Sequence, residues 1–366
     1  MPLLLRLAAL AAICPLIFSC EPLVTTFDND DELIIYYEAD PIVEVTTPPE
    51  NLRILTWNVK YAGGGLNFFY DCYDKRVLMT KTEVLENLGR LADKIIQLDP
   101  DIILIQEIEI GSKRSAYVDQ MQYLLNETAL NYGVYSSLWK AQYIPSDGLG
   151  RMDMGNAILS KFELTDAERI AFELRTDQDA LTQYFYLRRN IVRATAHVGS
   201  GLEVINTHTS AYSQDGSKEK QLIVFKDLLD QINADSLNFV AGGDLNTIPP
   251  NADKKNNFSD SICEDEDFVG DDYREETDWL RPLYRDYYPA IDTLVYATDE
   301  AAYFTHTVNS ADDQTRKLDY LFTNIEGGWD EKFSKVHNRS EMNYDRARIS
   351  DHAPVSAILV LPQGVQ

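Results

Sequence analysis

The stretch Asp101-Ile102-Ile103-Leu104-Ile105-Gln106-Glu107 is a continuous apolar run that ends in two polar side chains. A run without polar alternation is typical of a strand buried on both faces. It follows residues 82–98, where apolar side chains recur at helical spacing until Asp99-Pro100 ends the pattern. An amphipathic helix that leads into a fully buried strand predicts a layered α/β fold.

Further elements lie on both sides of this stretch. A second helix is predicted at 218–232. Strands are predicted at 52–57, 157–160, 190–198, 203–207, 238–241, 318–322 and 355–361, with a short one at 33–37. The strands near 192–198 and 202–207 flank Gly199-Ser200-Gly201, which is typical of a hairpin. We therefore expect mixed rather than purely parallel sheets.

The composition limits the classes of function. The chain has 366 residues, of which 45% are hydrophobic and 11% aromatic, so a packed core is expected. The net charge of −26 argues against a protein that mainly coats nucleic acid, because that affinity comes from Lys and Arg. It does not exclude an enzyme that acts on phosphates through a bound cation, since the metal then supplies the local positive charge.

The N-terminus has the pattern of an export signal. Residues 1–19 carry an early Arg6 and a short apolar run, as in a signal peptide. Ile17-Phe18-Ser19-Cys20 resembles a bacterial lipobox, in which Cys20 is acylated; an ordinary signal peptide with an incidental Cys is the alternative. We expect residues 20–50 to be the lipidated Cys and an acidic tether, and 51–366 to be one domain. The expected protein is a monomer anchored by lipid to a membrane, in the periplasm or at the cell surface.

Two other features leave alternatives open. Cys72 and Cys263 would remain in the mature chain, where an oxidising compartment permits a disulfide, but their spacing gives no geometric support for one. The irregular segment 251–286 holds the acidic run 264–267. It is expected to be a solvated surface insertion, with a structural Ca²⁺ loop as the alternative.

Polar residues of the kind that carry chemistry follow several predicted strands. Each motif alone is commonly a hydrogen-bonded core residue, but ligand sites of layered α/β proteins gather where strands end. The motifs are Trp57-Asn58, Gln106-Glu107, Asn206-Thr207-His208, Gly243-Asp244-Leu245-Asn246, Leu318-Asp319-Tyr320 and Ser350-Asp351-His352. Six such motifs in one chain predict a functional site.

These motifs, together with residues 155–160, occur in an order that resembles the endonuclease/exonuclease/phosphatase superfamily, also called DNase I-like. The resemblance runs from about residue 51 to residue 361. It implies an α/β fold in the form of a four-layer sandwich, with two mixed β-sheets flanked by helices. It also implies a divalent-metal phosphoesterase site at one edge.

The predicted site is rich in carboxylates. Glu107, Asp244, Asp319 and Asp351 would repel one another in one pocket, because two unit charges 4 Å apart cost roughly 4 kcal/mol at an effective dielectric near 20. The cluster therefore calls for a cation or for protonated partners. Hard oxygen ligands favour Mg²⁺ or Mn²⁺ over zinc. The resemblance implies that Glu107 is the principal metal ligand, with Asn58 and Asp351 nearby.

The resemblance also implies catalytic roles. Asp244 would orient or deprotonate the attacking water, and Asn246 would donate a hydrogen bond to the phosphate. His352, held by Asp319, would stay cationic against the developing charge. His208 would stabilise the phosphate or protonate the leaving oxygen. Which histidine is the acid stays open.

Other residues have weaker assignments. Arg188 or Arg189 would reach the phosphate, unless the two are a plain surface pair. The segment 66–70 is expected to be an aromatic packing loop, with a lid or substrate-contact loop as the alternative. His197, His306 and His337 match no motif and are expected to be ordinary surface or core residues.

Taken together, the sequence predicts an exported Mg²⁺-dependent phosphoesterase, a phosphodiester hydrolase that uses in-line attack of water. Nucleic acid, phospholipid and small phosphodiesters all stay open as substrates, and nothing chooses between a DNase and a sphingomyelinase-like enzyme. The alternative is a non-catalytic, surface-tethered binding protein on the same fold. That alternative predicts loss of metal-binding or histidine positions, and none is lost.

Overall fold

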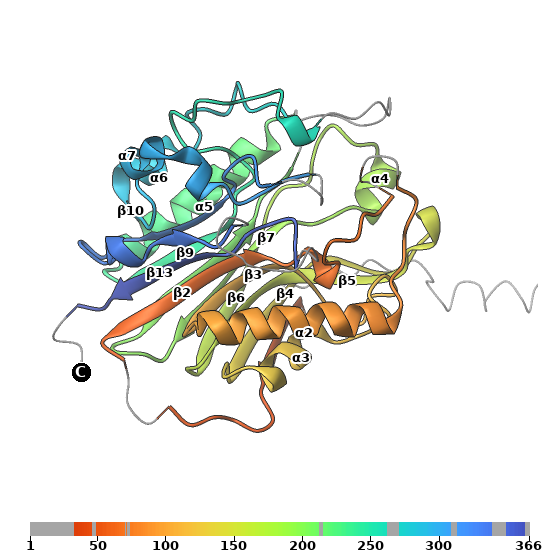
Figure 1. Cartoon of the computed structure of the whole chain (residues 1–366), viewed down its shortest axis with the longest axis horizontal. Helices are drawn as coiled ribbons and strands as arrows, with labels where there is room; N and C mark the ends of the chain where they lie inside the picture. The colour runs from red at the N-terminus through yellow and green to blue at the C-terminus, as the bar shows by residue number, and fades with distance from the viewer. Residues whose placement is uncertain are drawn as a thin grey trace, which may run out of the picture.

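The computed structural model describes residues 33–45, 49–69, 71, 74–211, 215–261, 271–308, 313–338 and 349–362. Two mixed β-sheets pack face to face, and helices cover the outer face of each (Figure 1). This arrangement confirms the predicted α/β sandwich. The predicted signal peptide, Cys20, Cys72 and Cys263 lie outside the described residues.

The first sheet has seven strands, and β2 and β3 at its centre are parallel. Its order is β1 (Ile34–Glu38), β4 (Tyr132–Ile144), β5 (Gly150–Ser160), β3 (Ile102–Glu109), β2 (Asn51–Asn58), β13 (Val355–Val360) and β12 (Lys335–Val336). Helices α2 (Lys81–Leu98) and α3 (Gln120–Glu127) lie against its outer face, below the strands in the view of Figure 1.

The second sheet has six strands, and here β8 and β9 are the parallel pair. Its order is β10 (Tyr288–Pro289), β11 (Asp319–Thr323), β9 (Phe239–Asp244), β8 (Leu202–His208), β7 (Asn190–Ala196) and β6 (Leu164–Ala171). Helices α5 (Ser217–Ala234) and α6 (Arg281–Asp286) pack on its outer face. The shorter helices α4 (Ala180–Phe185) and α7 (Thr293–Thr298) lie in connecting segments.

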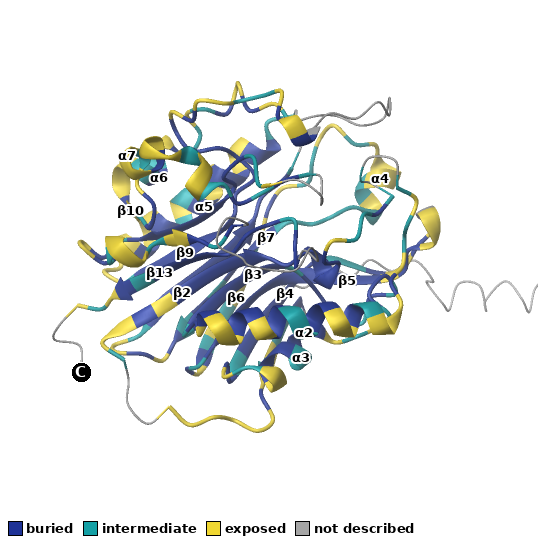
Figure 2. Ribbon diagram, viewed as in Figure 1, coloured by how far each residue is buried: buried dark blue, intermediate teal, exposed yellow. Residues whose placement is uncertain are grey.

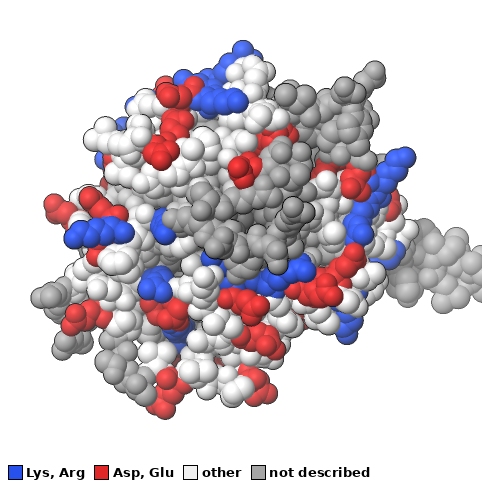
Figure 3. Space-filling model, viewed as in Figure 1, with Lys and Arg blue, Asp and Glu red and all other residues white. Residues whose placement is uncertain are grey.

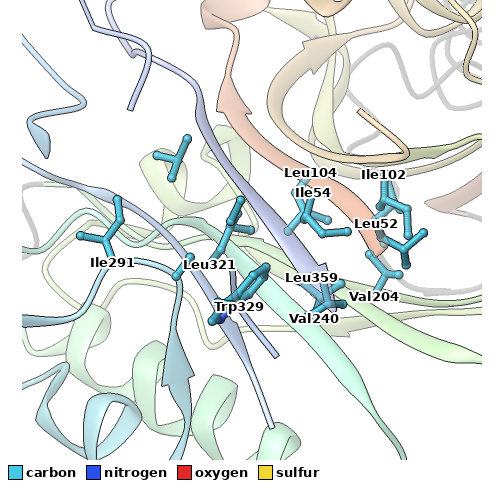
Figure 4. Packing of buried hydrophobic residues seen from close by; sticks show 14 of the residues in the cluster. Leu52, Ile54, Ile102, Leu104, Val204, Val240, Ile291, Leu321, Trp329 and Leu359 are labelled. Atoms are coloured by element: carbon cyan, nitrogen blue, oxygen red, sulfur yellow. The ribbon is translucent and has the colours of Figure 1, made fainter. Parts of the chain in front are cut away.

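The apolar run of β3 is buried on both faces, as its sequence predicts (Figure 2). Ile102 and Leu104 point between the sheets, where they belong to the same cluster as Val204, Val240 and Leu321 (Figure 4). Ile103 and Ile105 point the other way and pack with the apolar stripe of α2. A strand covered by a sheet on one face and a helix on the other has no polar alternation, because neither face meets water.

Helix α2 begins and ends where the sequence indicates. The Thr80 side chain accepts a hydrogen bond from the Glu83 backbone N–H, and the Glu83 carboxylate accepts one from the Thr80 backbone N–H, which is a capping box. At the other end, Asp99 adopts a left-handed conformation, with φ of 45°, directly before Pro100. The chain therefore passes from the end of α2 to the start of β3 within a few residues.

One expectation about the chain needed correction, and some strands were not predicted. The predicted strand at 33–37 exists as β1, but it pairs with β4 at the edge of the first sheet, so the folded domain begins before residue 51. β4 and β6 were not predicted, although β4 is the longest strand. The hairpin across Gly199-Ser200-Gly201 is confirmed as β7 and β8. Among the described residues, no helix is long and apolar enough to cross a membrane.

Candidate active site

The carboxyl ends of the two parallel pairs meet at one edge of the sandwich. Asn58 ends β2, beside Gln106 of β3, and His208 ends β8, beside Asp244 of β9. The Asn58 amide of one sheet donates a hydrogen bond to Asp244 of the other at 3.0 Å. A cleft of about 420 Å³ opens at this edge. Eight of the predicted site residues line it: Asn58, Glu107, Arg189, His208, Asp244, Asn246, Asp351 and His352.

Glu107 owes its position to an irregularity in β3. Its φ of 60° is left-handed, and the pairing of β3 with β5 shifts register between Ile105 and Ile108. Such a bulge re-aims a side chain at the end of a strand. Glu107 is half-buried and accepts a hydrogen bond from Asn58 Nδ2 at 3.3 Å. Asn58 Oδ1 meanwhile accepts the Lys60 backbone N–H at 3.0 Å, so the amide nitrogen faces the carboxylates.

Two glycines bring the strands close enough to place Asp244. A Cβ at Gly242 would lie 2.0 Å from the Tyr320 carbonyl oxygen, and one at Gly243 would lie 2.0 Å from the Thr207 carbonyl oxygen. Only residues without a side chain fit there. Asp244 follows directly and is 1% exposed. Burial raises its pKa to about 7, against the opposing effect of His352.

His352 forms a charged pair with Asp319, the first residue of β11. Its Nδ1 lies 2.8 Å from Asp319 Oδ2, and its Nε2 lies 3.6 Å from Asp244 Oδ2. Burial alone lowers the pKa of His352, but Asp319 and Asp244 more than offset it and raise the pKa to about 10. The predicted pairing with Asp319 is present, and it keeps this imidazole cationic at neutral pH.

His208 is in the opposite state, although it contacts the same carboxylate. Its Nε2 lies 3.3 Å from Asp244 Oδ2. Burial, followed by the positive charges of Arg189 and His352, holds its pKa well below the usual range. His208 is therefore neutral at pH 7. Two histidines whose pKa values are driven apart can take different roles in one reaction.

The remaining predicted residues are placed as follows. Asn246 donates its backbone N–H to Asp244 Oδ1 at 3.0 Å and its side-chain amide to the Thr209 carbonyl at 3.0 Å. Arg189 lines the cleft and donates to the His208 carbonyl at 3.1 Å. Arg188 is not among the cleft-lining residues, so of the two arginines Arg189 is the one at the site.

The segment 66–70 and the acidic insertion are placed in part. Phe68 is buried edge-on against Tyr61 at 5.0 Å, which supports the packing-loop interpretation for the described part of 66–70. In the insertion, Asp271 pairs with Arg316 and Asp272 with Arg274. Residues 264–267 lie outside the described part of the chain, so the Ca²⁺ loop stays a prediction.

Lys60 is a site residue that the sequence analysis missed. It is 2% exposed, and its Nζ lies 3.2 Å from Asp351 Oδ2 and 3.5 Å from Asp71 Oδ2. Burial lowers the pKa of Lys60, but these two carboxylates outweigh it and the net pKa is raised. In the sequence, the feature that could have pointed to Lys60 is its place two residues after Asn58. Nothing in the pattern showed that the backbone turns left-handed there and directs the chain inward.

His306 and Lys218 were also missed. His306 was expected to be an ordinary residue, but it lines the cleft, and its ring centroid lies 4.4 Å from that of His352. Lys218, at the start of α5, donates to the Asn246 carbonyl at 2.6 Å and to Glu276 at 2.8 Å. It thereby supports the loop that carries Asn246. No local motif marks either residue, because both act through contacts distant in sequence.

The donor set of the cleft fits a hard divalent cation. Its lining includes carboxylate and amide oxygens, and beside it the Asp319 Oδ1 atom is buried with no hydrogen-bond partner. Among the described residues, ligand atoms of Asp244, Asp319 and His352 lie within 4.8 Å of one another. A cationic His352 paired with Asp319 offers no lone pair to a metal, so this trio is better suited to holding a proton. Glu107, which lies on β3, is therefore the carboxylate available to bind a cation.

Comparison with known proteins identifies the fold and the family. The model of the Endonuclease/Exonuclease/phosphatase family matches residues 55–352. Similar solved structures include an endonuclease/exonuclease/phosphatase from Beutenbergia cavernae, at 17% identity and TM-score 0.53, with 85% of this chain and 72% of that chain covered. One from Bacteroides vulgatus has 14% identity and TM-score 0.51, with 85% and 99% covered.

A third similar structure is D. rerio TDP2 complexed with a single-strand DNA product, at 17% identity and TM-score 0.50, with 84% of this chain and 98% of that chain covered. No curated protein matches the sequence. At these identities the solved structures show a shared fold only. The family model, however, spans most of the chain and all six strand-end motifs. The chain therefore belongs to the endonuclease/exonuclease/phosphatase family.

Proposed function

We propose that this protein is a divalent-metal-dependent phosphodiesterase in which Asp244 activates the attacking water. The observation that carries the proposal is the position of the Asp244 carboxylate. Its Oδ2 lies 3.3 Å from His208 Nε2, 3.6 Å from His352 Nε2 and 3.0 Å from Asn58 Nδ2. A buried carboxylate with a pKa of about 7 is matched to proton transfer near neutral pH.

The surrounding groups have complementary roles in this proposal. The cationic His352 opposes negative charge on the phosphoryl group, and the neutral His208 donates or accepts a hydrogen bond at the same centre. Arg189 adds a fixed positive charge at the cleft. Glu107 is proposed to be the principal ligand of Mg²⁺ or Mn²⁺, with Asn58 and Asp351 nearby, and the ion would supply Lewis-acid polarisation of a phosphoryl oxygen.

The substrate class is proposed more broadly. Single-stranded nucleic acid is one candidate, supported by the DNA product bound to D. rerio TDP2. Phospholipids and small phosphodiesters are others, because the net charge of −26 does not favour long polyanions. Acidic and basic side chains are interspersed on the face seen in Figure 3. A metal-bound phosphate can be engaged without a basic stripe.

The decisive experiment is a screen in Mg²⁺ and Mn²⁺ against DNA, RNA, sphingomyelin, inositol phosphates and phosphomonoesters. Hydrolysis of a phosphodiester that is lost in Asp244→Asn and Glu107→Gln supports the proposal. A wild type that binds one of these compounds without hydrolysing it supports the non-catalytic binding protein instead. An Asp244→Asn variant as fast as wild type would overturn the assigned role of Asp244.

We also propose that the protein is exported and anchored as a monomer through a lipid on Cys20. The lipobox-like sequence 17–20 supports this proposal. A single Cys20→Ala change is expected to release the protein from membranes, because no other anchor is proposed. Fractionation of cells that express each form measures the difference. Full membrane retention of Cys20→Ala would contradict the anchor.

A further inference from the structure

Lys60 enters the acidic cluster through an unusual backbone segment. Lys60, Tyr61 and Ala62 have φ values of 44°, 43° and 56°, all left-handed and none at a glycine. Each such residue is strained, and a series of them persists only where surrounding structure enforces it. The Lys60 backbone N–H is held by Asn58 Oδ1 at 3.0 Å. The left-handed backbone and the Asn58 side chain therefore fix the position of this lysine.

The lysine ammonium is surrounded by the carboxylates of the cleft. It lies 3.2 Å from Asp351 Oδ2 and 3.5 Å from Asp71 Oδ2, and its side chain is 3% exposed. Asp351 Oδ1 lies 3.2 Å from the Ser350 hydroxyl, which lies closer, at 2.7 Å, to the Asn58 carbonyl, so Lys60 is the charged group that holds Asp351 through Oδ2. Asp71 Oδ2 also accepts the Phe68 N–H at 2.7 Å. Lys60 thus offsets one of the two negative charges on this side of the cluster, and both carboxylates are bonded to protein groups.

We propose that the Lys60 ammonium is a built-in cation that limits this site to one divalent ion. The inference rests on the proposed metal-dependent function. Two-metal phosphoesterase sites hold ions about 3.5–4 Å apart, and a second ion needs carboxylates that are free to ligate it. Here Lys60 engages Asp71 and Asp351, and its charge repels a second dication close by. The site can then bind one divalent ion, next to Glu107.

Counting bound Mn²⁺ tests this inference without measuring turnover. Electron paramagnetic resonance of free Mn²⁺ during titration of the full chain gives the stoichiometry. We expect one ion in wild type, one in the charge-preserving Lys60→Arg, and two in Lys60→Gln, where Asp71 and Asp351 lose the ammonium between them. The double variant Lys60→Gln/Asp71→Asn is expected to return to one. Lys220→Gln removes an exposed lysine 4.0 Å from Glu173 and serves as the matched control, with one ion.

The outcomes separate this inference from the proposed function. Two ions in wild type, with phosphodiester hydrolysis intact, would overturn the role of Lys60 and leave the function standing. A folded Lys60→Gln variant, checked by circular dichroism, that still binds one ion would also overturn it. If Lys60→Gln does not fold, Lys60→Met is counted in its place, and one ion in that folded variant would overturn the role of Lys60. No Mn²⁺ bound and no hydrolysis by wild type would overturn both.

Discussion

His352 lies between two carboxylates, with Nδ1 2.8 Å from Asp319 Oδ2 and Nε2 3.6 Å from Asp244 Oδ2. The Trp57 indole N–H donates to the His352 carbonyl at 2.9 Å and fixes its backbone. The His352 imidazole thus contacts a carboxylate of β11 and a carboxylate of β9. Asp319 thus affects Asp244 in two ways, by holding this ring and by its own negative charge, which raises the pKa of Asp244.

Replacing Asp319 by Asn is expected to lower kcat by about 10²–10⁴-fold, the usual contribution of a positioned acid or base. The amide removes the charge that, with Asp244, raises the pKa of His352 to about 10. A lower pKa means that His352 loses its proton at a lower pH, so the alkaline fall in rate moves toward neutrality. The pH–rate profile and the NMR titration of the His352 ring measure both effects.

A matched control is available for this experiment. His197→Asn removes an exposed histidine that bonds only at the surface, to Thr165 at 2.8 Å, and should leave the pH profile unchanged. An Asp319→Asn enzyme with wild-type kcat and an unshifted alkaline limb would show that His352 does not act as a cation.

Gly243→Ala is expected to destabilise the protein by about 3 kcal/mol or more, because the new Cβ would collide with the Thr207 carbonyl oxygen. The φ of 128° at Gly243 is also unfavourable for alanine. Gly89→Ala is the contrasting variant: it lies within α2, with the nearest atom 3.7 Å from its Cβ, and should keep or raise stability. Urea unfolding compares the two, and equal stability losses would contradict the close-approach argument.

The sequence was informative where local pattern and burial coincide. The apolar run of β3 and the stripe of α2 were predicted because each faces apolar partners along its whole length. Asp244 was predicted because it ends a strand, and His352 because it belongs to a motif that resembles those of the superfamily. Lys60 and His306 were not, since a left-handed turn and a ring contact between residues 306 and 352 depend on tertiary structure. β4 was missed because its pattern lacks regular alternation.

The two adjacent arginines provide a prediction about substrate binding. Arg189→Gln is expected to raise KM by about 10–100-fold, as loss of a hydrogen bond from a charged donor costs about 1.5–3 kcal/mol. Arg188→Gln should have a much smaller effect, because Arg188 does not line the cleft. Steady-state kinetics on the best substrate of the screen compares them. Equal losses in both variants would contradict a specific role for Arg189.

Lys317 gives a prediction about stability rather than catalysis. It is 1% exposed, its Nζ donates to the Asp319 carbonyl at 2.5 Å, and no carboxylate pairs with it directly among the described residues. Burial lowers its pKa from 10.5 to about 7, although Asp319 opposes the shift. Between these two pH values the unfolded chain binds a proton that the folded chain does not, so this group makes stability rise with pH.

Lys317→Met is therefore expected to raise the free energy of unfolding at pH 7 by about 1–4 kcal/mol, the range found when buried charged groups are replaced by apolar ones. The advantage should shrink as pH rises from 7 toward 10, because over this range the folded wild-type lysine is neutral while the unfolded one still binds a proton, so wild type gains stability with pH and the Met variant does not. Urea unfolding at pH 7, 8.5 and 10 measures this slope, with exposed Lys332→Met as the control. A Lys317→Met protein that is less stable than wild type at pH 7 would show that the bond to the Asp319 carbonyl outweighs the cost of burying the lysine.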